Sequence, residues 1–502
     1  MKILNAEQIR QADQFTIKHE PISSIDLMER ASKAFVEKFT SIYSNSRPVY
    51  IFCGTGNNGG DGLAIARLLL ALDYRVKTFI IGNVEKGSVD FNINYDRLKS
   101  SSIPFCIKKE HDFPELNGNT LVLDAIFGSG LTRGVNGIYG ELLEHITNSK
   151  CHKIVAVDIA SGLACSETFQ DGSILDVSNT ITFQTAKLSH LLPQNEKFSG
   201  SVDVVDIGLD KGFIRSLPSN YYQITERFVH SIYKKRSKYS HKGTAGKNLI
   251  VAGSMGKMGA AVLAVKACLR AGAGLVTTFL PRCGVDIMQV SVPEAMVIAS
   301  NEENLIGDIP GIENYNSIGI GPGIGVDYKT SGAVKLIIEN SKVPIVLDAD
   351  ALNIISENKS WLAELPEYSV LTPHPGEFQR LVGGWKNDYE RLALQLSFAK
   401  KYKVILILKG ANTSIATPDG MVFFNTTGNS GMATGGSGDV LTGVITALIG
   451  QGYNCDEASI LGVYLHGLSG DIYKEMNSEE SLIASDLIDN IGKAFQRIVN
   501  RN

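Results

Sequence analysis

A strand, a glycine-rich turn, a helix and a second strand follow one another between residues 49 and 82. The apolar run VYIFC precedes GTGNNGGDG, the amphipathic stretch LAIARLLLAL and a second apolar run, VKTFIIG. Two parallel strands need a crossover of about a dozen residues or more between them, usually a helix, and this segment has that form. The pattern therefore predicts a βαβ unit and an α/β fold.

Further strands are predicted at residues 120–123, 153–157 and 180–183, and the first two lead into loops rich in small and acidic residues. The carboxyl ends of parallel strands meet at one edge of a sheet, where ligands bind in folds of this type. Ahead of the βαβ unit, Asn5 with Gln8 three residues later resembles a capping box, which predicts an N-terminal helix.

The length of 502 residues predicts two or three domains. Periodicity fades around residues 215–245, a stretch rich in Tyr, Ser, Lys and Arg, and a fresh strand begins at Lys247. We place the boundary near residue 220, which gives domains at 1–220 and 225–502. The second half then repeats strand, loop and helix from NLIVAG and AAVLAVKACLRA onward, and this alternation predicts a second α/β domain.

Composition excludes several classes of protein. A net charge of −4, with one short basic run at 234–238 that fits a solvated linker, argues against a nucleic-acid partner. No stretch approaches the roughly 20 apolar residues that cross a bilayer, and the N-terminus lacks the apolar segment of a signal peptide. We therefore expect a cytoplasmic protein with no membrane partner. The seven cysteines show no metal-site or disulfide spacing: Cys53, Cys106, Cys151, Cys165, Cys268, Cys283 and Cys455.

The first motif, GTGNNGGDG at 54–62, follows a strand and opens a helix, so its amides would suit a phosphate or pyrophosphate. Its spacing departs from GxGxxG and lacks the GK[ST] of a P-loop. A tightly packed turn is the alternative. The side chains of Asn57, Asn58 and Asp61 favour a functional loop instead, because a packing turn does not need them.

Two aspartates end neighbouring predicted strands, Asp124 in LDAIFGSGL and Asp158 in VDIASGL. Each alone could be a helix-capping residue. Taken together, three loops would bring oxygens of Asn58, Asp124 and Ser161 toward one point, which is an environment that a small cation prefers.

In the second half, GNSGMATGGSGDVLTG at 428–443 places six glycines before and at the start of an apolar helix, with Asp439 near its first turn. Such a run forms an anion hole where backbone amides and the positive helix end stabilise a transferred phosphoryl group. An N-capping aspartate is the alternative.

GTGNNGGDG, DAIFGSGL and VDIASGL resemble the motifs of the NAD(P)H-hydrate epimerase domain over about residues 1–215, although Thr55 stands where proline is expected. The resemblance implies a Rossmann-like fold and a potassium ion bound by Asn58, Asp124 and Ser161. Epimerisation needs a carboxylate poised for proton transfer, and Asp158 is our candidate catalytic residue. The implied substrate-binding residues are Asn57, Asn58, Gly59, Gly60, Asp61, Gly128, Ser129, Gly130, Leu131, Thr132, Arg133, Gly134 and Asp158.

The GGSGD sequence is similar to the GAGD-type signature of ribokinase-like kinases. With HKGTAGKNLIVAGS, AGAGLVTT, GIGPGIG, DADAL, TPHPGE and KGANT, it follows the order seen in ADP/ATP-dependent NAD(P)H-hydrate dehydratases over about residues 225–500. The resemblance implies Asp439 as catalytic base, and Asp348 and Asp350 as through-water partners of Mg²⁺. Implied nucleotide-binding residues are Lys409, Gly410, Ala411, Asn412, Thr413 and Gly438. Implied substrate-binding residues are Ala260, Gly323, His374 and Asp439; a solvent-exposed loop histidine is the alternative for His374.

Together the resemblances imply a Rossmann-like three-layer domain followed by a ribokinase-like α/β domain, in a bifunctional enzyme that repairs hydrated NADH and NADPH. The first domain would epimerise the R and S hydrates. The second would dehydrate the S hydrate at the expense of ADP or ATP. We expect a homo-oligomer. The alternative is a kinase for a vitamin precursor, such as hydroxymethylpyrimidine or a thiazole alcohol, joined to a non-catalytic binding module.

Overall fold

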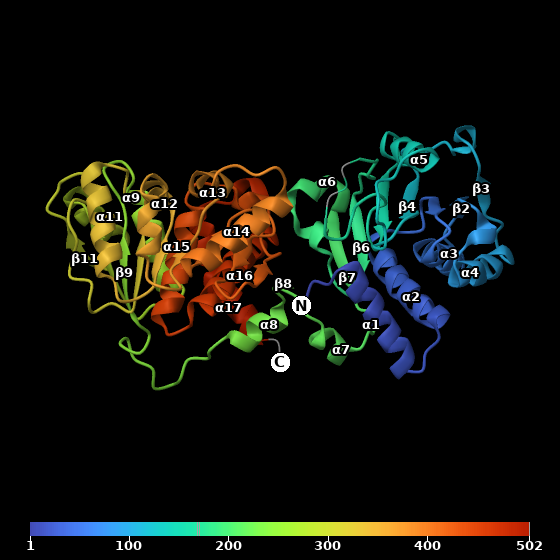
Figure 1. The fold of residues 1–502 in the computed structure, drawn as a ribbon. Coiled ribbons are helices and arrows are strands. Elements are labelled where there is room, and N and C mark those ends of the chain that lie inside the picture. Colours follow the sequence, from blue (N-terminus) through green and yellow to red (C-terminus); the bar gives the residue numbers. More distant parts are fainter. Residues whose placement is uncertain (168, 170, 501–502) are drawn as a thin grey trace. The chain divides into compact units, whose positions relative to one another are not determined.

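The computed structural model describes residues 1–167, 169 and 171–500, and the chain divides into two compact units (Figure 1). The first domain holds Lys2–Tyr221, and the second runs from Tyr222 onward and includes Met1. Within the described ranges, no helix is long and apolar enough to cross a membrane.

The first domain is built on a seven-stranded sheet in the order β3-β2-β1-β4-β5-β6-β7, with every neighbouring pair parallel. Chain order reverses between β1 and β4, so the loops after these two strands flank the switch point where ligands bind in such sheets. The predicted strand at 153–157 is β5 itself. The strands are β1 Val49–Cys53, β2 Val76–Ile81, β3 Phe105–Ile107, β4 Leu121–Ala125, β5 Lys153–Val157, β6 Asn179–Phe183 and β7 Ser201–Val205.

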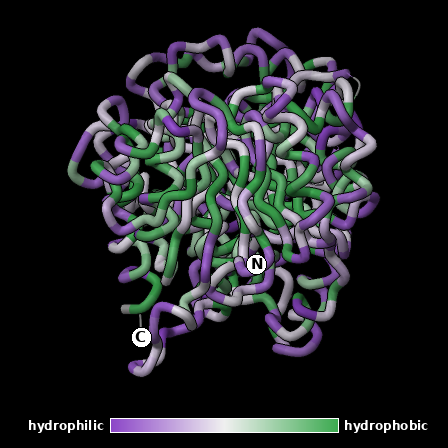
Figure 2. The backbone as a smooth tube through the Cα atoms, turned by 90° about the vertical axis from the view of Figure 1, so that its left-hand side faces the viewer, coloured by the Kyte–Doolittle hydropathy of each residue, from purple (hydrophilic) through white to green (hydrophobic). Residues whose placement is uncertain are grey.

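Helices cover both faces of this sheet and give the predicted three layers. Apolar residues of α2, α3 and α4, including Phe35, Leu63 and Phe91, share one core with the sheet, and Leu142 and Leu143 of α5 share the other. Figure 2 shows the same feature in the second domain, which faces the viewer there: its hydrophobic segments (green) gather in the interior. The helices are α1 Ala6–His19, α2 Ser24–Ile42, α3 Asn57–Leu70, α4 Val89–Lys99, α5 Ile138–Thr147, α6 Glu196–Ser199 and α7 Lys211–Ser216.

Two local predictions meet different outcomes. The capping box is confirmed, because the Gln8 amide donates to Asn5 Oδ1 at 2.9 Å and the Asn5 amide donates to Gln8 Oε1 at 3.0 Å. The motif GTGNNGGDG opens a helix as predicted, but this helix begins earlier than the run LAIARLLLAL, because α3 already starts at Asn57. A Cβ on Gly59 would lie 1.8 Å from the Gly54 carbonyl oxygen, so glycine lets the first turn of the helix fold against the strand end.

The second domain contains a ten-stranded sheet in the order β11-β10-β9-β12-β13-β14-β15-β16-β17-β8. The strands from β11 to β15 are parallel, and β16 and β17 add antiparallel pairs. The strands are β8 Tyr221–Gln223, β9 Lys247–Val251, β10 Leu275–Leu280, β11 Met296–Ala299, β12 Ser317–Ile320, β13 Ile345–Leu347, β14 Val370–Leu371, β15 Ile405–Leu408, β16 Ser414–Ala416 and β17 Val422–Phe424.

The main core of the second domain joins α9, α15, α16 and α17 to the sheet. It also takes in Val229 of α8, so part of the stretch where the sequence periodicity fades packs into this domain. The helices are α8 Glu226–Ile232, α9 Met258–Arg270, α10 Val285–Ser291, α11 Tyr328–Asn340, α12 Ala349–Glu357, α13 Pro375–Val382, α14 Asp388–Tyr402, α15 Ser437–Gly450, α16 Cys455–Lys474 and α17 Ala484–Asn500.

Candidate functional sites

A cavity of about 540 Å³ opens at the carboxyl edge of the first sheet. Its walls come from α1, from the loops after β1 and β4, and from the strand ends at Asp158 and Phe183. The loops after β1 and β4 meet closely, since a Cβ on Gly54 would lie 2.1 Å from the Ile126 carbonyl oxygen. The cavity therefore lies at the switch point that the topology defines.

Asp158 is held in this cavity by a fixed set of partners. Its backbone has a φ of +69°, which is uncommon for a residue with a side chain and is often found at functional positions. The Asp158 carboxylate accepts hydrogen bonds from Thr182 Oγ1 at 3.0 Å and from the Phe183 amide at 3.0 Å, and Lys187 Nζ lies 2.5 Å from the same oxygen. None of these contacts caps a helix, so the capping alternative for Asp158 is wrong.

Lys187, which lines the cavity and pairs with Asp158, is a site residue that the sequence analysis missed. Its side chain is fully buried, and its ammonium also donates to Thr182 Oγ1 at 2.8 Å and to the Phe183 carbonyl at 3.1 Å. Burial alone would raise the pKa of Asp158, but the charge and hydrogen bonds of Lys187 outweigh burial and hold this pKa below its usual range. The available signal was a lysine among the leucines of AKLSHLL, a few residues after the end of β6.

Two further carboxyls line the same cavity, Asp13 from α1 and Asp61 from α3. Burial, followed by repulsion from Asp158, raises the pKa of Asp13 to about 7. Burial and the neighbouring carboxylates likewise raise the pKa of Asp61 well above its usual range. The cavity thus combines carboxyls with widely different proton affinities, as acid–base sites do.

Of the predicted substrate contacts in the first domain, the structure brings most to the cavity and leaves three outside its lining. Gly59 and Gly60 lie buried inside α3, and Gly134 packs against Asp171. Those that line the cavity are Asn57, Asn58, Asp61, Gly128, Ser129, Gly130, Leu131, Thr132, Arg133 and Asp158.

The three predicted potassium ligands gather around the turn that follows β4. Asp124 accepts from the Ser161 hydroxyl at 2.6 Å and from the Ser161 amide at 2.7 Å, and the Ser161 hydroxyl in turn accepts from the Phe127 amide at 2.9 Å. A Cβ on the next residue, Gly128, would lie 3.4 Å from Asn58 Oδ1. Asp124 caps no helix, so the capping alternative is wrong here too. The Asn58 side-chain nitrogen is buried without a hydrogen-bond partner among the described residues.

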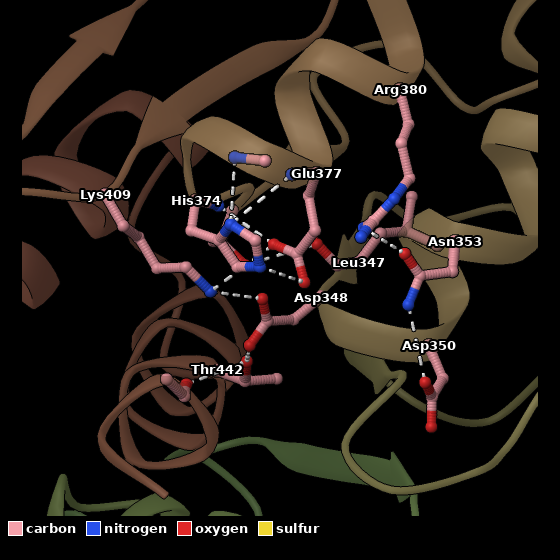
Figure 3. Close-up of polar contacts among 12 residues, drawn as sticks. Leu347, Asp348, Asp350, Asn353, His374, Glu377, Arg380, Lys409 and Thr442 are labelled. Atoms are coloured by element: carbon pink, nitrogen blue, oxygen red, sulfur yellow. Dashed lines mark hydrogen bonds and ion pairs between the residues drawn. The ribbon is translucent and has the colours of Figure 1, made fainter. Parts of the chain in front are cut away.

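In the second domain, Asp348 and Lys409 form the centre of a buried polar cluster (Figure 3). Lys409 Nζ lies 2.7 Å from Asp348 Oδ1, Thr442 Oγ1 donates to Asp348 Oδ2 at 2.9 Å, and Glu377 Oε2 lies 4.0 Å from Lys409 Nζ. Burial would raise the pKa of Asp348, but Lys409 and the hydrogen bonds hold it below its usual range. Sequence reasoning missed Glu377 and Thr442, which lie inside the quoted motifs.

Asp439 lies in the first turn of α15, beside this cluster. The helix N-cap is Gly436 and α15 has no side-chain cap, so the capping alternative for Asp439 is wrong. The Ser437 amide donates to the Thr434 carbonyl at 3.4 Å, and the Gly438 and Asp439 amides, which have no partner among the described residues, are available to an anion. Burial, with repulsion from Asp348, raises the pKa of Asp439 to about 6. A Cβ on Gly438 would lie 3.2 Å from Lys409 Nζ, so this glycine lets the helix start approach the ammonium.

The predicted substrate contacts of the second domain fall in two places. A Cβ on Gly323 would lie 3.1 Å from the Cβ of Ala260, so these two residues adjoin. His374 caps α13, with Nδ1 accepting from the Gly376 amide at 3.0 Å, and its side chain is half exposed. Asp350 is already bonded to the Gly325 amide at 2.9 Å and faces Lys257 at 3.3 Å.

The predicted nucleotide loop is the turn between β15 and β16. Its backbone is left-handed at Asn412, with a φ of +54°, and the Thr413 hydroxyl donates to the Gly410 carbonyl at 2.9 Å. Gly410 and Ala411 are exposed. Lys409 at the start of this loop reaches into the Asp348 cluster.

The fold and sites define a class of protein: an enzyme that joins a Rossmann-like domain to a ribokinase-like domain, each with an aspartate–lysine pair at the carboxyl edge of its sheet. Residues 24–189 match the model described as YjeF-related protein N-terminus, and residues 248–493 match the NAD(P)H-hydrate dehydratase model. The chain belongs to the family of bifunctional NAD(P)H-hydrate repair enzymes.

Relatives of this name align over nearly the whole chain. The bifunctional NAD(P)H-hydrate repair enzyme of Moorella thermoacetica is 36% identical over 97% of this chain and 96% of its own length. The enzyme of the same name from Thermofilum pendens is 32% identical over 99% of this chain and 97% of its own length. A solved ribokinase-like superfamily protein from Enterococcus faecalis is 26% identical, with a TM-score of 0.50, and covers 56% of this chain and 98% of its own.

Proposed function

We propose that the first domain interconverts the R and S hydrates of NADH and NADPH, and that the second dehydrates the S hydrate at the expense of ADP or ATP. The observation that carries this proposal is the pair of buried lysine–aspartate clusters, each at the carboxyl edge of its own sheet. The two tasks are consecutive, because a dehydratase that accepts one epimer needs a supply from the other. The vitamin-precursor kinase is not favoured, since the full-length relatives carry the repair activity in their names.

In the first domain, Asp158 faces the hydrated ring and exchanges a proton with the substrate hydroxyl or with water. Lys187 keeps this carboxylate ionised and fixes its orientation through the shared oxygen. The walls from Ser129 to Arg133 exclude bulk water and position the dinucleotide.

Asn58, Asp124 and Ser161 fit a potassium ion, because all three offer oxygen ligands and they gather at one turn. A side-chain amide can be turned to present its oxygen, and the orphaned buried Asn58 nitrogen is consistent with a missing partner at this point. When bound, the ion supplies a positive charge that neutralises Asp124 and holds the loop after β4.

In the second domain, Asp439 removes the proton of the substrate hydroxyl, and the terminal phosphoryl group of the nucleotide passes to that oxygen. Phosphate then leaves as the ring nitrogen donates its electron pair, and loss of a proton from the adjacent ring carbon restores the dihydropyridine. The free amides at the start of α15 stabilise charge on the transferred group. Ala260, Gly323 and His374 contact the hydrate in this proposal.

Lys409 to Thr413 and Gly438 hold the nucleotide, with Mg²⁺ supplying charge to its phosphates when bound. Asp348 and Asp350 fit the ion through water, because their oxygens already accept protein hydrogen bonds. These two carboxylates also add negative charge beside Asp439.

The test is to incubate the full chain with hydrated NADH, Mg²⁺ and either ADP or ATP, and to follow the return of dihydronicotinamide absorbance. Recovery with one nucleotide supports the proposal and identifies the donor. Persistence of the hydrate with both nucleotides, with ATP consumed on a pyrimidine or thiazole alcohol, would establish the kinase instead.

A further inference from the structure

The epimerase cavity is lined by three carboxyl groups, and its lysine pairs with one of them. Asp13, Asp61 and Asp158 all line it, and the Lys187 ammonium lies on Asp158 at 2.5 Å. Among the described residues, neither Asp13 nor Asp61 takes part in a hydrogen bond or an ion pair. Two carboxyls therefore face the cavity with their oxygens free for a ligand.

Helix α1 holds Asp13 in a fixed position on its own wall of the cavity. Ile9, Arg10 and Asp13 line the cavity from one side of this helix, while Ala12 and Thr16 are buried. Asp158 comes from a different wall, at the end of β5. A bound ring therefore meets carboxyls supplied by separate elements.

Inversion of the hydroxyl-bearing carbon requires two proton transfers. The hydroxyl must be protonated as its bond to carbon breaks, and the incoming water must lose a proton as it adds to the other face of the ring. The proton donor and the proton acceptor therefore act on opposite faces of the ring, and in the reverse direction their roles exchange. One fixed carboxyl lies on one face of the ring, so the other face needs a group from a different wall of the cavity.

We propose that Asp13 is a second catalytic acid–base of the epimerase site and acts with Asp158 on the hydrated ring. Asp13 donates its proton to the hydroxyl oxygen, the carbon–oxygen bond breaks, and the ring nitrogen's electron pair forms a carbon–nitrogen double bond. Water then adds to the opposite face and gives a proton to Asp158. No co-reactant is consumed, because solvent returns a proton to Asp13 and takes one from Asp158. The inference rests on the proposed epimerase function.

The electrostatics of the cavity agree with this geometry. Burial, repulsion by Asp158 and partial compensation by Lys187 bring the pKa of Asp13 to about 7, so both of its protonation states are populated at neutral pH. Asp61 has a pKa well above its usual range, because of burial and the charges of Asp158, Asp13 and Asp90. Asp13 is therefore the carboxyl best matched to donating and accepting protons.

Other charged and titratable groups face Asp13 from the surrounding walls. Arg10 of α1, Arg133 of the loop after β4 and Tyr139 of α5 also line the cavity. Behind Lys187, burial lowers the pKa of His190 to about 3, so this histidine stays neutral. Burial raises the pKa of the nearby Cys165 thiol to about 11, so it stays protonated.

The test compares full-length wild type, Asp13→Asn and the control Asp96→Asn, which changes an exposed aspartate of α4. Each protein receives one hydrate epimer without nucleotide at a series of pH values. Chromatography separates the two epimers and gives the rate of epimerisation, from which the spontaneous rate in buffer is subtracted. Asp13→Asn is expected to lower the epimerase kcat by about 10²–10⁴-fold with little change in KM. The pH–rate profile of wild type should change near neutral pH, where Asp13 titrates, and Asp13→Asn should lack this change. Asp96→Asn should match wild type.

An Asp13→Asn enzyme with wild-type kcat and pH profile would overturn the inference while leaving the epimerase function intact. If wild type itself does not exceed the buffer rate, the proposed function fails, which is a separate result. Far-UV circular dichroism checks folding. If Asp13→Asn does not fold, the pH–rate profiles of Asp13→Glu and wild type are compared between about pH 5 and about pH 9. A rate change near neutral pH in wild type that moves to another pH in Asp13→Glu supports the inference. Any other combination of the two profiles contradicts it.

Discussion

Replacement of Lys187 with methionine would remove the ammonium group from Asp158 while keeping most of the buried volume. The Lys187 side chain is fully buried, so the variant leaves the Asp158 carboxylate without its nearest positive charge. Thr182 Oγ1 and the Phe183 carbonyl lose a hydrogen-bond donor as well. Breaking one side of a buried ion pair costs about 3–5 kcal/mol, and we expect the first domain to lose stability by that amount near neutral pH.

The loss of stability in Lys187→Met depends on pH, and the pKa of Asp158 sets the direction of this dependence. In wild type its pKa lies below the usual range, so its stabilising contribution is present above the unfolded-state value and is lost as the pH falls through the folded value. Without Lys187, burial dominates and the folded pKa lies above the unfolded value, so folding takes up a proton. The difference between wild type and variant is therefore largest at about pH 8 and shrinks toward about pH 5.

Urea unfolding of the full chain measures the effect with an internal reference. Both tryptophans, Trp361 and Trp385, belong to the second domain, so their fluorescence follows that domain alone, whereas far-UV circular dichroism follows both. Lys187→Met should shift the circular dichroism transition and leave the fluorescence transition unchanged. The control is Lys153→Met, which changes an exposed lysine of the same domain.

A double variant, Lys187→Met with Asp158→Asn, removes both charges and should recover part of the lost stability. A loss below about 1 kcal/mol, or a loss that does not vary with pH, would show that the pair does not carry buried charge and would refute this reasoning.

Three further predictions concern the second domain. Asp439→Asn should lower the kcat of nucleotide-dependent dehydration by about 10²–10⁴-fold and leave epimerisation unchanged, as measured on separated epimers; loss of both activities would argue for misfolding instead. Because a base must be ionised and the pKa of Asp439 is raised to about 6, dehydration should rise through that pH and level off above it, and a flat profile would exclude Asp439 as the base. Gly438→Ala places a Cβ 3.2 Å from Lys409 Nζ and 3.3 Å from Asp348 Oδ2, so the KM for nucleotide should rise, whereas Gly332→Ala in α11, with open space around it, should not change it.

Local pattern predicts much of this fold. Residues 153–157 form β5 as expected, because four buried apolar residues follow Lys153 and an aspartate ends the strand. The helix start at Asn57 was missed, because glycine normally disfavours a helix and the need for glycine at position 59 comes from the close approach of the Gly54 carbonyl. The parallel order of seven strands depends on contacts between distant segments, which local periodicity does not encode.

The candidate sites were predictable where a motif carries the residue. Asp158 and Asp439 each stand in a recognisable run, and the structure places Asp158 in a buried and Asp439 in a half-buried charged environment. Lys187 and Thr442 were missed because their roles arise only on folding: Lys187 meets an aspartate 29 residues away, and Thr442 meets Asp348 across 94 residues. Asp13 lies even farther along the chain from its cavity partners, within an ordinary amphipathic helix.

The most direct test of the two-domain account is the fraction of an equal mixture of R and S hydrates of NADH that the enzyme restores with Mg²⁺ and the preferred nucleotide. Wild type should restore all of it in one continuous phase. Asp158→Asn should restore the S half rapidly and then stop at the slow rate of spontaneous epimerisation, and addition of Asp439→Asn protein should release the remainder. Complete rapid restoration by Asp158→Asn would contradict the assignment of epimerisation to the first domain.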